Sequence, residues 1–260
     1  MIKRVEFFNR EQKIDGLLYL NNKAPLVIIC HGFTVNKNNK FLAHIAKMLH
    51  KAGFSVLMFD FRGSGASEGE FTTLKEEVSD FKEAVKFAKK FSKKLIFLGH
   101  SLGATIVTLS RLQARGIILI NPELSFELTT FNFMRKVIPQ FFIRRAFKKI
   151  DNFAYKKFEN LSVYGKFIAK NFRFMIGEEF LRECKMLRPA IIRNIRSPVL
   201  FIQSRKDKIV FPKGTRKAFE LARKPKEFFL IEGDHKVSKY AHKMTATKKI
   251  LVWLANLKLR

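Results

Sequence analysis

The chain has 260 residues, of which 47% are hydrophobic, so it can bury a large core and is not a disordered protein. It contains no apolar run long enough to span a bilayer, and its first residues alternate charge and bulk, which predicts a cytoplasmic protein. Its formal net charge of +29 creates a positive potential that attracts anionic partners, although the scattered lysines also fit an ordinary solvated surface.

The first half of the chain alternates short apolar runs with helical patterns. Residues 2–8 and 12–20 predict two strands joined by a polar turn, an antiparallel hairpin at a sheet edge. Continuous apolar runs, typical of buried parallel strands, follow at 26–30, 55–59, 95–98 and 116–120. Helical spacing of apolar residues predicts helices around 42–52, 78–88 and 102–114. This alternation predicts an α/β fold with a mainly parallel sheet and helices on both faces.

The pattern breaks at Asn121-Pro122 and resumes near Pro198. The intervening segment is helical in pattern, cationic and Phe-rich, without a buried-strand signal, which predicts a mostly helical insertion. The α/β pattern then returns as strands at 198–202 and 227–231 and helices at 213–222 and near the C-terminus. We therefore divide the chain into a core of residues 1–121 and 197–260 and a helical cap of residues 122–196.

The run at 95–98 ends in Gly99-His100-Ser101-Leu102-Gly103 and then becomes helical, so a Gly-x-Ser-x-Gly pattern lies at a strand-to-helix turn. A serine on such a turn projects above the sheet, and glycines are needed at 99 and 103, where backbone crowds backbone. We therefore predict that Ser101 is a nucleophile. The simpler alternative is a serine that caps the following helix.

An acid and a base follow Ser101 in the chain, each just beyond a predicted strand. A carboxylate at Asp207 would stay ionised and hold the imidazole of His235, which would take the proton of Ser101. The simpler alternative for Asp207 is a solvated carboxylate between two lysines. Three other carboxylates are alternative acids: Asp60, Asp80 and Asp234.

An acyl-transfer site also needs donors for a developing oxyanion. The backbone N–H of Leu102, at the start of a helix, is one candidate, and that of Phe33, just past the turn at Gly32, is the second. We expect His31 to brace this loop and His100 to point away from the serine. The six histidines have no metal-ligand spacing, so we expect no metal.

Two further patterns are interpreted as structural. The glycine-rich loop at 60–69 fails as a dinucleotide fingerprint because its third glycine would fall at Glu68, so we expect a turn near the rim of the site. Cys30 and Cys184 are far apart and predict two free thiols. No zinc-finger, RNP-like or Gly-x-x-Gly motif stands out, so no specific nucleic-acid partner is expected.

The chain resembles the serine α/β-hydrolase superfamily, and within it the cinnamoyl/feruloyl esterase and monoacylglycerol lipase-like branch. The matching stretches span nearly the whole chain: 31–33, 60–69, 99–103, 198–212 and 231–235. The resemblance implies an α/β-hydrolase fold with an eight-stranded sheet, no cofactor and hydrolysis through an acyl-serine intermediate, with the 122–196 insertion as the cap. The chain departs from its relatives where Gln203-Ser204 replaces the common His-Gly, and where the loop before His235 is one residue shorter.

The cap is expected to set the substrate, because a core of this type accepts different substrates through what covers the serine. Its phenylalanines either pack it internally or line an acyl or aryl pocket, and a basic helix around 138–150 is a candidate for contact with an anionic membrane. Our leading hypothesis is a hydrolase of small to medium carboxylic esters, with thioesterase or lysophospholipase as the nearest alternatives. Peptidase action is weaker, and a non-catalytic binding protein for an anionic partner is the alternative of another class.

Overall fold

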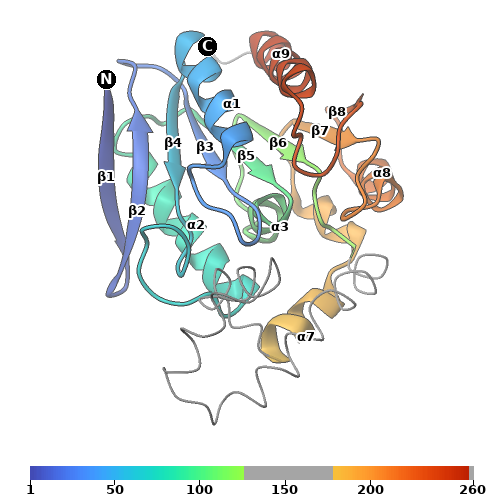
Figure 1. The fold of residues 1–260 in the computed structure, drawn as a ribbon, viewed down its shortest axis with the longest axis horizontal. Coiled ribbons are helices and arrows are strands. Elements are labelled where there is room, and N and C mark those ends of the chain that lie inside the picture. The colour runs from blue at the N-terminus through green and yellow to red at the C-terminus, as the bar shows by residue number, and fades with distance from the viewer. Residues whose placement is uncertain (126–177, 258–260) are drawn as a thin grey trace, which may run out of the picture.

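A computed structural model describes residues 1–125 and 178–257 of the chain. In these residues the strands form one eight-stranded sheet in the order β1-β2-β4-β3-β5-β6-β7-β8 (Figure 1). β1 pairs with β2, and β2 with β4, in antiparallel fashion, and the other neighbours are parallel. The strands are β1 (Ile2–Asn9), β2 (Gln12–Tyr19), β3 (Leu26–Cys30), β4 (Ser55–Phe59), β5 (Leu95–His100), β6 (Gly116–Ile120), β7 (Val199–Ser204) and β8 (Lys226–Ile231). The predicted mostly parallel sheet is confirmed.

Helices cover both faces of this sheet. The α-helices are α1 (Lys40–Lys51), α2 (Leu74–Ala88), α3 (Leu102–Leu109), α7 (Glu178–Met186), α8 (Pro212–Leu221) and α9 (Tyr240–Asn256), and η1 (Pro189–Asn194) is a 3₁₀-helix. One apolar core joins the sheet to α1 and α9, and the other joins it to α2, α3, α7 and α8. Strands β3 to β7 are buried along their whole length, which explains their uninterrupted apolar runs. No helix among the described residues has the length and apolar character needed to cross a membrane.

Helix α3 is shorter than the sequence pattern predicted, ending at Leu109 and not near residue 114. The Ser110 hydroxyl donates to the Val107 carbonyl oxygen at 2.7 Å and accepts from the Leu112 N–H at 3.2 Å. Arg111 then has a φ of 57°, outside the helical region. Local side-chain bonds of this kind compete with the helix, so the apolar residue at 112 continues the pattern without continuing the helix.

The predicted cap lies mostly outside the described residues, including the basic segment at 138–150. Its described end consists of α7 and η1, which are helical as expected. Glu183 of α7 accepts hydrogen bonds from the backbone N–H groups of Leu74, at 2.5 Å, and Lys75, at 3.4 Å, at the start of α2. A carboxylate there meets unpaired N–H groups and the positive end of the helix dipole, so α7 is fastened to the core.

Candidate active site

Ser101 lies on a tight turn between the end of β5 and the start of α3, with φ 55° and ψ −123°. This conformation is uncommon for a residue other than glycine. A Cβ atom at Gly99 would lie 2.4 Å from the Ala104 Cα, and one at Gly103 would lie 2.4 Å from the carbonyl oxygens of Cys30 and His31. Both glycines therefore allow the close approach of backbone to backbone that the pattern predicted.

The structure brings Ser101, His235 and Asp207 into one hydrogen-bonded line. The Nε2 atom of His235 lies 3.0 Å from the Ser101 hydroxyl oxygen, and its Nδ1 atom lies 2.8 Å from Asp207 Oδ2. Because an ionised carboxylate only accepts, Nδ1 carries the hydrogen and Nε2 is left to accept from the serine. Ser101 makes no side-chain capping bond to α3.

Asp207 is held by its own loop. It is only 4% exposed, and its Oδ1 atom accepts hydrogen bonds from the backbone N–H groups of Ile209, at 2.8 Å, and Val210, at 2.9 Å. The other oxygen is thereby directed at His235. This is not the solvated loop carboxylate that the sequence allowed as the alternative.

The three alternative acids are engaged elsewhere. Asp60 accepts from the backbone N–H groups of Lys37, at 2.6 Å, and Ala66, at 2.9 Å, and pairs with the Lys37 ammonium. Asp80 pairs with Arg62, and Asp234 accepts from the Ser238 hydroxyl and N–H. None of these hydrogen bonds joins the carboxylates to His235.

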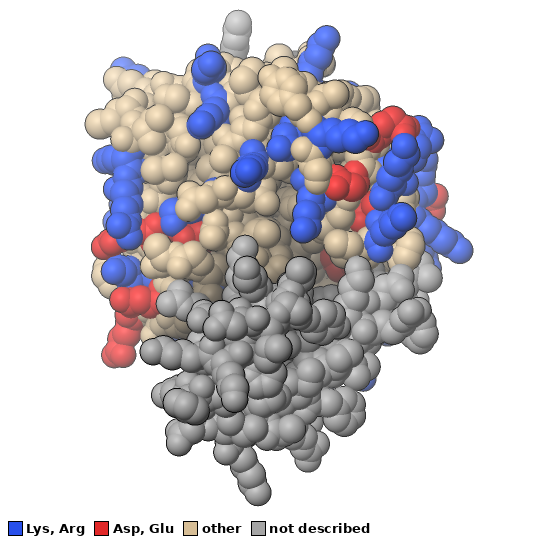
Figure 2. All heavy atoms as spheres, viewed as in Figure 1, with Lys and Arg blue, Asp and Glu red and all other residues tan. Residues whose placement is uncertain are grey.

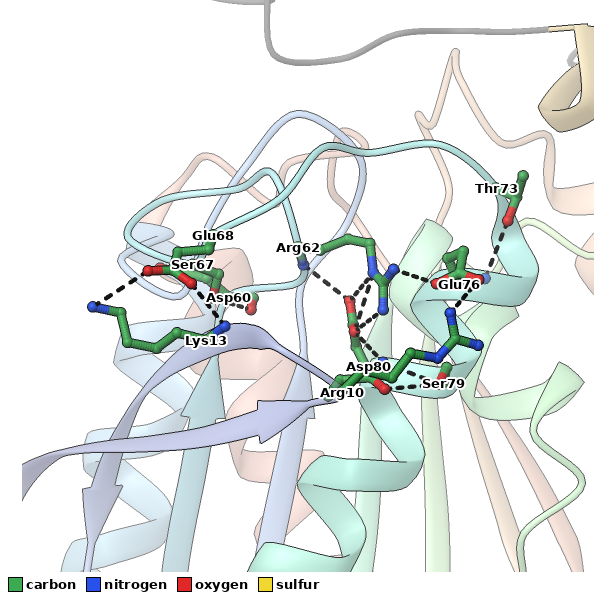
Figure 3. A network of polar contacts seen from close by, with 11 residues as sticks. Arg10, Lys13, Asp60, Arg62, Ser67, Glu68, Thr73, Glu76, Ser79 and Asp80 are labelled. Atoms are coloured by element: carbon green, nitrogen blue, oxygen red, sulfur yellow. Dashed lines mark hydrogen bonds and ion pairs between the residues drawn. The ribbon is translucent and has the colours of Figure 1, made fainter.

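The glycine-rich loop at 60–69 is held by a polar network (Figure 3). Arg62 points back into the fold, where it contacts Asp80 and Glu76 at the start of α2. The residue before Arg62 is Phe61, whose N–H donates to His31 Nε2 at 3.1 Å. His31 Nδ1 in turn donates to the Gly32 carbonyl oxygen at 2.8 Å, so His31 braces its own loop. The loop therefore supports the turn that carries Phe33.

One candidate oxyanion donor, Leu102, directly follows the serine, and the turn that precedes the other, Phe33, lies close to it. Leu102 is the first residue of α3, so its N–H has no acceptor within that helix. The turn before Phe33 approaches from β3: a Cβ atom at Gly32 would lie 3.1 Å from the Ser101 Cβ. The Phe33 ring packs with Phe71 and with Phe180 of α7, at centroid distances of 5.1 and 6.0 Å. An aromatic wall therefore borders this side of the site.

Two histidines near the site are buried and neutral. Burial and the neighbouring His235 lower the pKa of His100 to about 4. Its Nε2 atom donates to the main-chain oxygen of His235 at 2.9 Å, so this side chain lies against the loop that carries the base. Burial also lowers the pKa of His31. Neither side chain therefore adds a positive charge next to the histidine that contacts Ser101.

The thiols of Cys30 and Cys184 are both buried and form no disulfide with each other. Burial raises the pKa of each, so neither is an activated nucleophile. Across the described parts of the chain, no group of three or more histidine, cysteine or acidic side chains is placed to hold a metal ion.

Sequence reasoning missed one polar residue of the site. Asn121 ends the β6 run, and its side chain contacts the loops of both Asp207 and His235. The signal was its place, since a polar residue directly after a buried strand lies at the carboxyl edge of the sheet. The departure at Gln203-Ser204 is also accommodated: Gln203 accepts from the Thr215 hydroxyl at 2.7 Å and donates to the Val210 carbonyl oxygen at 3.3 Å.

Solved structures with the same fold span almost the entire chain. The esterase Pf2001 of Pyrococcus furiosus superposes with a TM-score of 0.73 at 20% identity, covering 99% of this chain and 93% of that one. Est1E of Butyrivibrio proteoclasticus, solved with ferulic acid bound, gives 0.70 at 20% identity, covering 98% and 100%. At these identities the likeness establishes the fold.

Similarity in sequence to individual proteins is either distant or short. The uncharacterised protein YqkD of Bacillus subtilis is 27% identical over 239 residues, 89% of this chain and 71% of its own length. An uncharacterised 31.7 kDa protein from the traX-finO intergenic region of Escherichia coli is 33% identical over 112 residues, 41% of this chain. That match spans only 39% of the relative's own length. The model described as serine aminopeptidase, S33, matches residues 21–236, and ends just past His235. The chain therefore belongs to the serine aminopeptidase S33 family of α/β hydrolases.

Proposed function

We propose that this hydrolase is a serine esterase that cleaves carboxylic esters of small to medium acyl or aryl groups through an acyl-serine intermediate. The observation that carries the proposal is the line from Asp207 through His235 to Ser101, with contacts of 2.8 and 3.0 Å. Each contact is within the range over which a proton is shared or transferred. The line begins at a buried carboxylate, Asp207, and ends at Ser101, which is held in an uncommon backbone conformation.

In the acylation step, the Ser101 oxygen attacks the ester carbonyl while His235 Nε2 takes its proton. Asp207 remains ionised and stabilises the imidazolium that forms. The negative charge on the former carbonyl oxygen is met by the N–H groups of Leu102 and Phe33. A single donor of this kind contributes about 3 to 4 kcal/mol of transition-state stabilisation.

The tetrahedral intermediate collapses when the imidazolium of His235 gives its proton to the leaving alcohol oxygen. A water molecule then enters and attacks the acyl carbon while His235 removes its proton. The imidazolium returns that proton to the Ser101 oxygen as the acid leaves. His100 stays neutral at the pH where this cycle runs, because its pKa is about 4. His100 therefore adds no second positive charge beside the imidazolium.

We assign the choice of acyl group to the cap, proposed to comprise residues 122–196. The part of its border that is described is aromatic: Phe180 packs on Phe71 at a centroid distance of 4.9 Å, next to Phe33. Such a wall supports apolar acyl or aryl groups over charged ones. Thioesters and lysophospholipids present the same carbonyl to the same nucleophile, so they remain the nearest alternatives.

The first test is covalent labelling with a fluorophosphonate, which reacts with activated serines. We expect one label on the wild-type protein, at Ser101, and none on Ser101→Ala. Unlabelled wild-type protein would contradict an active serine and favour the non-catalytic binding protein.

Substrate class is tested on a panel with matched chromophores. We expect turnover of p-nitrophenyl esters with an optimum at short or medium chains, or of hydroxycinnamate esters, above that of acyl-thioesters and lysophospholipids. Aminoacyl p-nitroanilides belong in the panel because of the family's description. A preference for anilides over esters would replace the esterase assignment with a peptidase.

We also propose that the protein contacts an anionic membrane surface through its positive charge. Helices α1 and α9, which lie side by side on one face of the sheet, contain no acidic residue, whereas α2 carries both signs. Figure 2 shows lysine and arginine side chains spread over the described part of the face that it draws. We call the outer surface of α1 and α9 the cationic face. Its exposed lysines are Lys40, Lys47, Lys51, Lys239 and Lys248.

A further inference from the structure

Asn121 joins three strand ends at the carboxyl edge of the sheet. It follows β6, is fully buried and has a φ of 45°, a conformation that asparagine tolerates better than most residues. Its Nδ2 group donates to the main-chain oxygen of His235 and to the Ser204 hydroxyl, both at 3.0 Å. Its Oδ1 atom accepts from the Ser204 N–H at 2.7 Å.

These contacts allow only one orientation of the amide. The backbone N–H of Ser204 requires an acceptor, and the carbonyl of His235 requires a donor, so the oxygen and nitrogen of Asn121 cannot be exchanged. Each of the two amide hydrogens has one partner. The side chain is therefore fully satisfied and couples the start of the acid loop to the histidine loop.

The same carbonyl oxygen of His235 has a second donor. His100 Nε2 reaches it at 2.9 Å from the turn that carries Ser101, and the two imidazole rings lie 5.2 Å apart. With two donors the carbonyl has both lone pairs engaged. The backbone of the base is thus fixed from β6 by Asn121 and from β5 by His100.

We propose that Asn121 is a positioning residue, which holds the main chain of His235 and the loop of Asp207 in one register so that the imidazole meets Ser101. This inference rests on the proposed serine mechanism. His235 must pass from neutral base to cation and back without moving away from either partner. A backbone held by two donors leaves only the side-chain torsions free, which limits the imidazole to the line between Asp207 and Ser101.

The chemistry at Ser204 supports this assignment. A glycine at 204 would retain the backbone N–H that meets Asn121 but would lack the hydroxyl. In this chain the hydroxyl gives the second amide hydrogen of Asn121 an acceptor at 3.0 Å. The serine therefore adds a contact between Asn121 and the acid loop.

The test uses the rate of fluorophosphonate labelling of Ser101 in the full-length protein. Asn121→Asp keeps the shape but places an oxygen against the His235 carbonyl, so we expect labelling about 100-fold slower, the loss that a misplacement of about 1 Å can cause. With an ester substrate, kcat falls and KM is unchanged, because substrate binding is not altered. The decisive measurement makes Asn121→Asp in a protein that already carries His235→Ala. In that background, Asn121→Asp should not slow the residual labelling any further.

Two further variants separate positioning from folding. Asn121→Gly accepts the positive φ and introduces no buried charge, so it folds even if the aspartate does not, and it should also slow labelling. The matched control is Asn21→Asp, at an asparagine beside the start of β4 whose amide also donates to main-chain oxygens, those of His50 and Phe54, both at 3.0 Å; it should lower the melting temperature without slowing labelling.

The proposal is overturned if Asn121→Asp and Asn121→Gly label at the wild-type rate, or if the aspartate slows labelling equally with and without His235. Absence of labelling in the wild type is a different result, which removes the serine mechanism itself.

Discussion

Replacing Asp207 by asparagine tests the assignment of the acid most sharply, because the structure dictates how the amide must turn. The N–H groups of Ile209 and Val210 point at one side-chain oxygen, at 2.8 and 2.9 Å. An asparagine keeps those bonds only by placing its oxygen there, so its NH₂ group faces His235 Nδ1. The imidazole must then accept at Nδ1 and carry its hydrogen on Nε2, opposite the Ser101 hydroxyl.

A histidine in that tautomer cannot take the proton of Ser101. The expected loss in kcat is about 10⁴-fold, equivalent to ~5.5 kcal/mol of transition-state stabilisation. The assay is hydrolysis of a p-nitrophenyl ester, with KM expected to change little. Asp234→Asn is the matched control, since that carboxylate accepts from Ser238 and should be dispensable for turnover. Undiminished turnover by Asp207→Asn, or an equal loss in the control, would refute the reasoning.

Three further predictions follow from packing, ionisation and surface charge. Gly103→Ala places a methyl group against two carbonyl oxygens and should lower the free energy of unfolding by about 1 to 3 kcal/mol in urea titrations, whereas Gly214→Ala, with only a side-chain carbon at 3.4 Å, should not. The pKa of His100 falls from 6.5 to about 4 on folding, so the unfolded chain binds the extra proton and stability is lost as the pH falls between these values. The free energy of unfolding should fall by ~3 kcal/mol over this pH range, and the free energy of unfolding of His100→Gln should not show this fall. The protein should pellet with anionic vesicles but not with neutral ones, and added salt should weaken this binding. Reversing the charge of Lys40, Lys47 and Lys248 should also weaken it, whereas reversing the charge of Lys75, Lys82 and Lys86 of α2 should not. An equal effect of both sets of three would refute a cationic face.

The sequence predicted all eight strands of the sheet, including the partly exposed β1, β2 and β8. The strands from β3 to β7 have no exposed face, so each leaves a continuous apolar run, and their parallel order places every following loop at one edge of the sheet. The positions of Ser101, Asp207 and His235 directly after strands were therefore enough to predict that these three residues lie close together. Their separation in the chain did not matter.

What the sequence did not predict depends on contacts between loops. The pairing of Asn121 with Ser204 and His235 requires the relative register of β6, β7 and β8, which no local pattern encodes. His100 could be assigned no partner for the same reason. The early end of α3 is a competition between two sets of hydrogen bonds of similar strength, and apolar periodicity does not report it.

The backbone at Ser101 has a consequence for the stability of the chain. A non-glycine residue held at φ 55° and ψ −123° stores about 1 to 3 kcal/mol of strain, and a glycine at this position would not. Ser101→Gly should therefore melt at a higher temperature than the wild type while losing its reaction. The proposed nucleophile therefore stands at a position where the residue that reacts is less stable than the residue that would fit the backbone best.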